Sequence, residues 1–191
     1  MGKRFSENGT NWKIKLGTDK MNSAKRLSRD FYIRDVLDVA PEVPGKNMVI
    51  KFPGGSQERF RITEVEAYRG SEDRACHAFK GRTARTEVMF DQGGKLYIYL
   101  IYGMYWMLNI VTGEKDNPQA ILIRGVEQYP GPGKLTKSLG IDKSFYGEDL
   151  VFSERIWLED IGLVQPVKCS PRIGIDYAGE YWMSRPWRYY I

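Results

Sequence analysis

The chain has 191 residues, which suits one domain that buries about 70% of its unfolded surface. Its composition is 42% hydrophobic and 28% charged, as in a globular protein. Two distant cysteines, Cys76 and Cys169, argue against a disulfide framework or a structural zinc site and favour a reducing compartment.

The net charge of +5 is unevenly distributed. Residues 1–29 carry eight basic and two acidic side chains, a balance of +6, so the remainder is near −1. We therefore expect residues 1–22 to be a flexible basic tail and residues 23–191 to form the folded domain. Such a tail adds non-specific affinity for nucleic acid. No apolar segment follows the early charges, so we expect no secretory signal.

The predicted elements are short and mostly strands. A helix is expected from Ser28 to Ala40, with Ser28 or Asp30 as its N-cap and Pro41 at its end. The others are strands over 48–52 and 59–68 joined by a Pro-Gly-Gly turn, a short helix near 82–90, a strand over 119–126, a short helix near 135–139, and strand-like pieces near 167–175 and 187–191.

Residues 62–77, ITEVEAYRGSEDRACH, contain the only histidine of the chain, His77. Strand periodicity places Ile62, Glu64, Glu66 and Tyr68 on one face. A carboxylate, an aromatic ring and an imidazole can together hold a flat aromatic ligand beside an ionisable group. Taken alone, the segment favours a simpler interpretation, a solvated strand face and a structural histidine.

Residues 96–111, LYIYLIYGMYWMLNIV, are too short for the ~20 residues that cross a bilayer. Their tyrosines, Gly103 and Asn109 favour two strands joined by a tight turn. Tyr102, Met104 or Tyr105 would then lie at an exposed tip. A membrane-associated role of this segment is the alternative.

Several common chemistries lack their motifs. The zinc deaminase pattern is absent, because Ala78 and Phe79 follow Cys76-His77. The chain has no G-x-S-x-G elbow, Walker A loop or GxGxxG motif. One histidine makes a poor catalytic metal site, so we expect no metal and no cofactor.

Several collinear segments resemble the alkyladenine (3-methyladenine) DNA glycosylase family of mammals and many bacteria. They are TEVEAYRGSEDRACH (63–77), LYIYLIYGMYWMLNIV (96–111), QAILIRGVE (119–127), GPGKLTKSLGIDKSF (131–145), PRIGIDYAGE (171–180) and RPWRYY (185–190). The resemblance implies a single α+β domain with a curved antiparallel sheet, partly open and barrel-like, short surrounding helices and a protruding β-hairpin.

The resemblance implies a monofunctional DNA glycosylase of base excision repair, without AP lyase activity. Its substrate is double-stranded DNA containing damaged purines: 3-methyladenine, 7-methylguanine, hypoxanthine or ethenoadenine. The enzyme would flip the damaged nucleotide and hydrolyse its N-glycosidic bond. It is expected to act as a monomer without a membrane, in the cytoplasm near the nucleoid if bacterial and in the nucleus if eukaryotic. A non-catalytic sensor of damaged bases with the same fold is the alternative.

The resemblance also assigns roles to residues. Glu66 matches the catalytic glutamate that activates water. The remaining roles are base binding by Tyr68, His77, Tyr99 and Asn109, DNA intercalation by Tyr102 with Met104 beside it, and DNA-backbone contacts by Arg82, Thr83, Arg85, Arg124, Lys134 and Lys143. The segment 42–45, Glu-Val-Pro-Gly, departs from the family pattern, and the loop after His77 is shorter than in mammalian members, so Arg82 and Arg85 are aligned less firmly.

Overall fold

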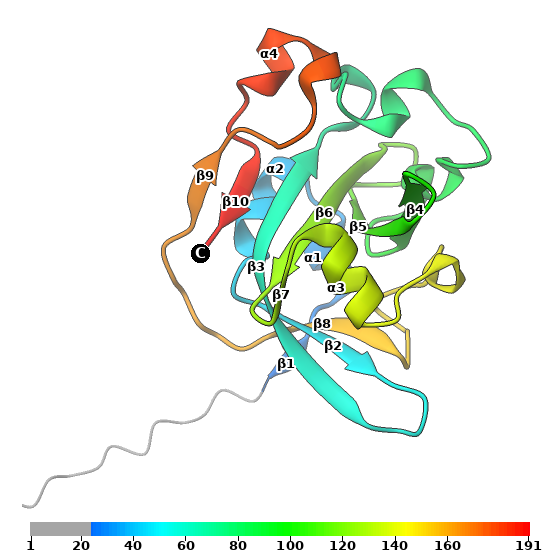
Figure 1. Ribbon diagram of the computed structural model, residues 1–191, viewed down its shortest axis with the longest axis vertical. Coiled ribbons are helices and arrows are strands. Elements are labelled where there is room, and N and C mark those ends of the chain that lie inside the picture. The colour runs from blue at the N-terminus through cyan, green and yellow to red at the C-terminus, as the bar shows by residue number, and fades with distance from the viewer. Residues whose placement is uncertain (1–23) are drawn as a thin grey trace, which may run out of the picture.

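The computed structural model describes residues 24–191, so the tail predicted over 1–22 lies outside the described residues. Ten strands form one curved antiparallel sheet that does not close into a barrel (Figure 1). Within residues 24–191, four short α-helices lie around it. The predicted α+β fold in one domain is therefore confirmed.

The strands of the sheet follow the order β1-β8-β2-β3-β6-β5-β4, with β10 also on β3, β9 on β10 and β7 on β6. They are β1 (Lys25–Arg26), β2 (Asn47–Lys51), β3 (Gln57–Tyr68), β4 (Leu96–Ile101), β5 (Tyr105–Thr112), β6 (Gln119–Val126), β7 (Tyr129–Pro130), β8 (Ile156–Asp160), β9 (Lys168–Ser170) and β10 (Arg188–Tyr190). The α-helices are α1 (Arg29–Tyr32), α2 (Val36–Val39), α3 (Pro132–Ser138) and α4 (Glu180–Met183).

Strand β3 organises the sheet because its two halves have different neighbours. The first half pairs with β2, and the second half lies between β6 and β10. The register with β6 shifts on both sides of Glu64, which marks a β-bulge. As a result Ile62 joins Val65 and Ala67 in the core, so the prediction that Ile62 shares a face with Glu64 and Glu66 was wrong.

The main core lies on one face of the sheet, between the strands and the helices α1, α2 and α3. Alternate residues of the central strands supply it, since successive side chains of a strand point to opposite faces. Its fully buried members include Val36, Val39, Ile62, Val65, Ala67, Leu96, Leu108, Ile110, Ile121 and Ile123. The other face of the same strands is left for the functional site.

The helix predicted from Ser28 to Ala40 is broken in two, which corrects that prediction. The first piece ends at Tyr32 with Ile33 as its C-cap, and Asp35 caps the second piece, where its carboxylate accepts from the N–H of Leu37 at 2.9 Å. Gln119 of β6 binds the same site, since its Oε1 accepts from the N–H of Val36 at 2.7 Å. This hydrogen bond between the sheet and the first residue of α2 fixes the orientation of the helix, which the local hydrophobic periodicity does not encode.

Two other predicted elements are shorter than expected. The helix expected near 82–90 is only a 3-10 turn at Glu87–Phe90, and the strand-like piece near 167–175 contributes only β9. The predicted strand over 119–126 and the helix near 135–139 are both present, as β6 and α3.

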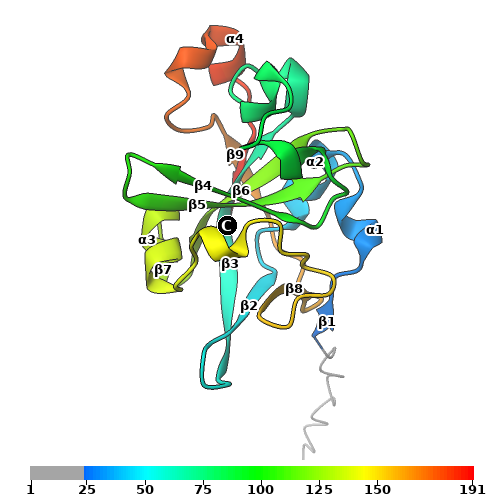
Figure 2. The same ribbon diagram turned by 90° about the vertical axis from the view of Figure 1, so that its right-hand side faces the viewer.

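The β4–β5 hairpin protrudes from the body of the molecule (Figure 2). Its turn has Tyr102 at φ +53° and Gly103 at φ +68°, and the N–H of Met104 donates to Ile101 at 3.2 Å. Two successive residues with positive φ are what a type I′ turn requires. Within residues 24–191, no helix is long and apolar enough to cross a membrane.

Candidate active site

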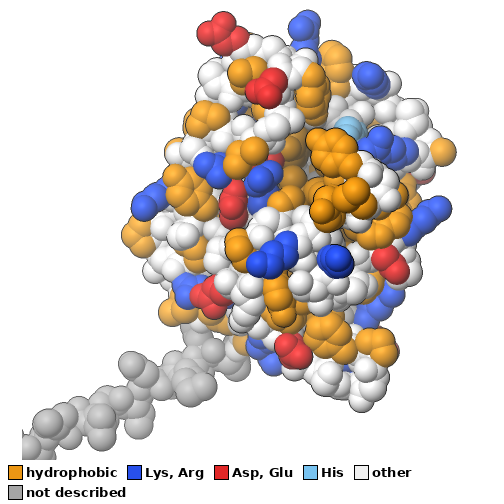
Figure 3. Space-filling model, in the orientation of Figure 1, with side chains coloured by type: hydrophobic (Ala, Val, Ile, Leu, Met, Phe, Trp, Pro, Cys, Tyr) orange, Lys and Arg blue, Asp and Glu red, His pale blue; other side chains and the backbone are white. Residues whose placement is uncertain are grey.

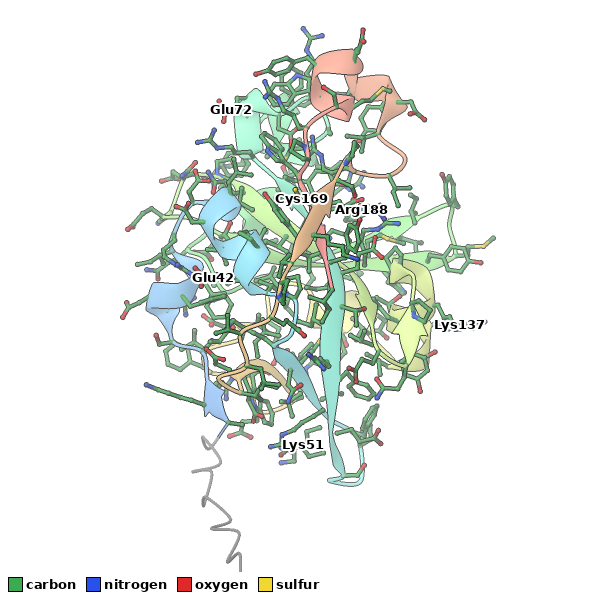
Figure 4. The ribbon with its side chains drawn as sticks, turned by 90° about the vertical axis from the view of Figure 1, so that its left-hand side faces the viewer. Glu42, Lys51, Glu72, Lys137, Cys169 and Arg188 are labelled. Atoms are coloured by element: carbon green, nitrogen blue, oxygen red, sulfur yellow. The ribbon has the colours of Figure 1, made fainter. Side chains whose placement is uncertain are left out.

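One row of side chains crosses five strands on the face of the sheet opposite the main core. The register aligns Tyr97, Asn109, Leu122, Glu66 and Arg188 in that order. Residues directly opposite in neighbouring strands share a face and lie within contact distance. Figure 4 shows Arg188 near the middle of the molecule, on β10 beside β3. The row therefore brings together residues that are up to 122 positions apart in the sequence.

A cleft of about 1540 Å³ opens over this row. Its volume exceeds the ~300–1,000 Å³ of typical small-ligand pockets, so it has room for more than one flat ring. The predicted residues that line it are Tyr68, His77, Thr83, Arg85, Tyr99, Tyr102, Asn109, Arg124 and Lys134. The cleft thus gathers nine predicted side chains from separate segments.

Glu66 lies directly beneath the cleft and has no exposed surface. Its Oε1 accepts from the N–H of Ile173 at 2.8 Å, and its Oε2 accepts from the hydroxyl of Tyr68 at 2.8 Å. The guanidinium of Arg124 approaches Oε1 to 3.3 Å. A carboxylate has about four acceptor sites, so these two hydrogen bonds and the ion pair leave room for a further proton.

Arg124 belongs to a chain of alternating charges and is not a free cation. Besides Glu66, it pairs with Glu64 at 3.0 Å, and Arg188 pairs with the same oxygen of Glu64 at 3.0 Å. Only 15% of the Arg124 side chain is exposed. The arginine predicted to lie near a phosphate therefore also holds the catalytic candidate in place.

Tyr68 is supported from behind by a buried ion pair. Arg172 and Asp73 have no exposed side-chain surface and pair at 2.5 Å, with a second contact at 3.0 Å. The Cζ of Arg172 lies 4.8 Å from the ring centroid of Tyr68. Burial and the neighbouring Glu66 raise the pKa of Tyr68 well above its usual value, so its hydroxyl remains a donor.

His77 faces the ring of Tyr99 at the other side of the cleft, with ring centroids 4.6 Å apart and planes at 72°. Its Nδ1 lies 2.9 Å from the hydroxyl of the buried Tyr97. Burial, with a smaller effect of Arg85, lowers the pKa of His77 to about 4. The imidazole is thus neutral at physiological pH.

Asn109 forms part of the cleft floor and is held rigidly. Its Nδ2 donates to the carbonyl of Tyr97 at 3.0 Å and to that of Met107 at 3.3 Å. The side chain is 3% exposed and lines the cleft. A fixed amide at this depth restricts which ring substituents fit.

The hairpin tip presents apolar side chains to solvent. Tyr102 is 82% exposed and Met104 is 65% exposed. Tyr102 lines the cleft mouth, whereas Met104 lies outside the lining. Large exposed apolar side chains grouped on a protruding turn are typical of an interaction site.

The cleft has a basic rim. Within residues 24–191 none of its cations has a carboxylate within ion-pair distance, except for Arg124. Figure 3 shows the histidine beside a hydrophobic cluster, with Lys and Arg side chains around it. The unpaired members of this rim are Arg74, Lys80, Arg85, Lys134 and Lys137.

Two of the predicted backbone contacts lie outside the cleft lining. Arg82 pairs with Glu87 at 2.8 Å and also with Asp116. Lys143 belongs to the 3-10 turn Lys143–Phe145. Of these two residues, Lys143 could contact DNA without breaking a described ion pair, whereas Arg82 could not.

Sequence reasoning missed several residues of the site: Asp73, Tyr97, Arg172, Ile173, and the rim cations Arg74, Lys80 and Lys137. Two signals were present in the quoted segments. Asp73 follows Glu66 within 63–77, and Arg172 and Ile173 belong to PRIGIDYAGE. Their contacts are long-range, so sequence spacing alone does not reveal them. Within residues 24–191, no cluster of three or more metal-ligating side chains is found.

Comparison with known proteins identifies relatives over almost all of the described chain. The profile of the methylpurine-DNA glycosylase (MPG) family matches residues 30–130 and 127–191. A protein of Methanocella arvoryzae named "Putative 3-methyladenine DNA glycosylase" is 44% identical over 184 residues, covering 86% of this chain and 91% of its own. Proteins of the same name from Borrelia garinii subsp. bavariensis and Desulfitobacterium hafniense are 42% and 40% identical, covering 86% and 87% of this chain and 95% of each relative.

Proposed function

Because the chain belongs to the methylpurine-DNA glycosylase family and is therefore a DNA glycosylase, we propose that it excises damaged purines from duplex DNA with Glu66 as its base. The proposed substrates are alkylated or deaminated purines, namely 3-methyladenine, 7-methylguanine, hypoxanthine and ethenoadenine. The names of the relatives support the first of these. The other three rest on the breadth of an aromatic pocket, since stacking accepts every purine.

The observation that carries the proposal is the set of contacts around Glu66. Two hydrogen bonds and an ion pair orient its carboxylate and leave an acceptor site for water. As the bond from C1′ to the purine nitrogen breaks, its electron pair moves to the base and the sugar becomes cationic. The carboxylate opposes that charge and takes a proton from the water whose oxygen adds to C1′. No metal or cofactor takes part in this scheme.

The aromatic side chains bind the flipped base in this proposal. Tyr68, His77 and Tyr99 sandwich the base: His77 and Tyr99, whose ring centroids are 4.6 Å apart, share one side, and Tyr68 lies on the other. Each stacking contact is worth about 1–3 kcal/mol. Asn109 obstructs ring substituents that do not fit the floor of the cleft. Because flipping costs a few kcal/mol and less for a damaged pair, the pocket favours lesions over normal purines.

The rim and the hairpin hold the DNA. Tyr102 enters the duplex from the minor groove and fills the gap left by the flipped nucleotide, with Met104 beside it. Thr83, Lys134 and Lys143 contact the phosphate backbone, and Arg124 lies close to the flipped nucleotide. Arg82 joins them when DNA displaces its carboxylate partners. Such contacts supply affinity and position without reading the sequence.

The test is a single-turnover assay on a duplex oligonucleotide with one hypoxanthine or ethenoadenine. Wild type is compared with Glu66→Gln, which keeps the shape of the side chain and removes its charge. Glu127→Gln is the matched control, because Glu127 pairs with Arg61 at the surface, 49% exposed. We expect strand breaks only after alkali treatment, with wild type and the control, and none with Glu66→Gln.

Each other outcome has a distinct meaning. Breaks without alkali would indicate a lyase step and contradict a monofunctional enzyme. Equal cleavage by Glu66→Gln would remove Glu66 from the mechanism. Tight lesion binding without cleavage of any damaged purine would favour the sensor instead.

A further inference from the structure

Arg85 reaches further into the aromatic pocket than a backbone contact requires. Its Cζ lies 5.0 Å from the ring centroid of Tyr99, and its Nη2 lies 3.5 Å from Nε2 of His77. Both of these side chains belong to the proposed base pocket. The guanidinium plane therefore borders the space where a flipped purine would stack.

The charge of Arg85 is uncompensated, in contrast to that of Arg82 in the same loop. Arg82 pairs with Glu87 and Asp116, and its guanidinium stacks on Phe90 at 4.4 Å. Within residues 24–191, Arg85 has no ion-pair partner. Its charge also contributes to the lowered pKa of His77. One loop thus places a neutralised arginine outside the cleft and a free one over the pocket.

We infer that Arg85 selects damaged purines by charge, favouring neutral bases such as hypoxanthine and ethenoadenine over cationic N-alkylated ones. This inference rests on the proposed function. In the ground state a fixed cation repels a purine that already carries a positive charge and leaves a neutral purine unaffected. The preference is relative, so cationic lesions remain substrates.

Measured from free enzyme and free DNA, the same charge acts differently on the transition states of the two classes. The electron pair of the bond from C1′ moves onto the purine in both cases. A neutral purine becomes anionic unless it is protonated, and the nearby guanidinium stabilises that charge. A cationic purine becomes neutral and is released from the repulsion of the bound state, so its barrier from the bound state falls by a similar amount. Measured from free enzyme and free DNA, only the neutral purine gains stabilisation in the transition state. Arginine stays protonated in proteins, so Arg85 acts here as an electrostatic group and not as an acid.

The effect should be modest because Arg85 is exposed. The guanidinium carries a unit charge 5.0 Å from the Tyr99 ring, on which the purine would stack. Screened by solvent, this charge should change the relative rates on the two lesions by about tenfold. Added salt should reduce the effect on binding, since exposed charges are screened over about 8–10 Å.

The experiment compares two duplexes that differ only in the lesion, hypoxanthine or 7-methylguanine. Two quantities are measured for each duplex: the single-turnover rate at saturating enzyme, and the enzyme concentration that gives half of that rate. The proteins compared are wild type, Arg85→Gln, Arg85→Lys and Arg82→Gln. We expect Arg85→Gln to lower the saturating rate on both lesions about tenfold and to tighten binding of the 7-methylguanine duplex. The ratio of the saturating rate to the half-saturating concentration should therefore fall only for hypoxanthine. Arg85→Lys keeps the charge and should retain most of the wild-type preference. Arg82→Gln should weaken binding of both duplexes equally.

The outcomes separate this inference from the function on which it rests. If Arg85→Gln weakens binding of both lesions by the same factor with a shallower salt dependence, Arg85 is a phosphate contact and the inference is wrong. The inference is also wrong if Arg85→Gln changes neither the preference between the two lesions nor the binding of either duplex. If wild type cleaves neither lesion nor any other damaged purine, the proposed function fails first and the inference fails with it.

Discussion

The buried pair of Arg172 and Asp73 should be the most sensitive structural element of the site. Arg172 donates to both carboxylate oxygens of Asp73, at 2.5 and 3.0 Å, and to the carbonyl of Ala67 at 2.9 Å. Its guanidinium also lies 4.8 Å from the ring of Tyr68 and 5.0 Å from that of Trp187. Replacing Arg172 with methionine keeps the bulk of the side chain and leaves a carboxylate buried without its cation.

Removing one partner of a buried ion pair costs about 3–5 kcal/mol. Asp73 keeps two backbone donors, the N–H groups of Arg69 at 3.1 Å and Ala75 at 3.0 Å, so we expect a value near 3 kcal/mol. For a domain of this size, that loss lowers Tm by about 6–12 °C. Arg172→Met should also slow excision below its Tm, because the adjacent Ile173 N–H orients Glu66.

Thermal and urea unfolding of Arg172→Met, Asp73→Asn and the double variant form a cycle that isolates the pair. We expect the double variant to be more stable than Arg172→Met alone, because Asp73→Asn removes the unpaired charge. The buried pair has no such role if Arg172→Met lowers the free energy of unfolding by less than about 1 kcal/mol. The same holds if the double variant is less stable than Arg172→Met alone.

Two further predictions concern the hairpin and the histidine. Tyr102→Asn should leave the free energy of unfolding unchanged or raise it by up to about 1 kcal/mol, because asparagine tolerates the left-handed backbone at φ +53°. The same change should weaken binding of a lesion duplex about tenfold through lost stacking, and unchanged binding in a fluorescence titration would exclude Tyr102 as the wedge. His77 has a folded-state pKa of about 4 against an ordinary value of 6.5, so its stabilising contribution is present above pH 6.5 and is lost as the pH falls toward 4. Between pH 7 and 4.5, urea unfolding should show wild type losing about 1–2 kcal/mol more than His77→Gln, after discounting for the partly exposed ring, and parallel losses would contradict a neutral, desolvated imidazole.

Strand positions were predictable where the signal is local. The run over 119–126 alternates between core and cleft, and β6 has those bounds. The tight turn at Gly103 was likewise encoded by the tyrosine-rich segment around it. In contrast, the break between α1 and α2 depends on Gln119, more than 80 residues away, and the face of Ile62 depends on a bulge against β6. Neither the helix break nor the bulge can be predicted from hydrophobic periodicity, whether of two residues for a strand or of 3.6 residues for a helix.

The same division applies to the site. The family resemblance brought Tyr68, His77 and Tyr99 to attention, and the structure gathers all three at the cleft. It did not indicate that Glu66 is fully covered, because its cover comes from Ile173 and Arg124 on other strands and loops. It also gave no sign that Arg82 and Arg85 differ, since Arg82 alone pairs with Glu87 and with Asp116, which lies 34 residues from Arg82.

Some residues of the site are held by the register of the sheet and others lie on exposed loops, and substitutions in the two groups differ in their effect on stability. The row from Tyr97 to Arg188 is fixed by strand register, and a slip of one residue would move every member to the other face. The charge of Arg85 stands on an exposed loop, where substitutions typically alter stability by less than about 0.5 kcal/mol. If Arg85 selects lesions as proposed, changes in loop charge should retune lesion preference while the buried carboxylate and the aromatic rings stay in place. It follows that Arg85 variants should fold as well as wild type, so a change in their lesion ratio reports on the pocket itself.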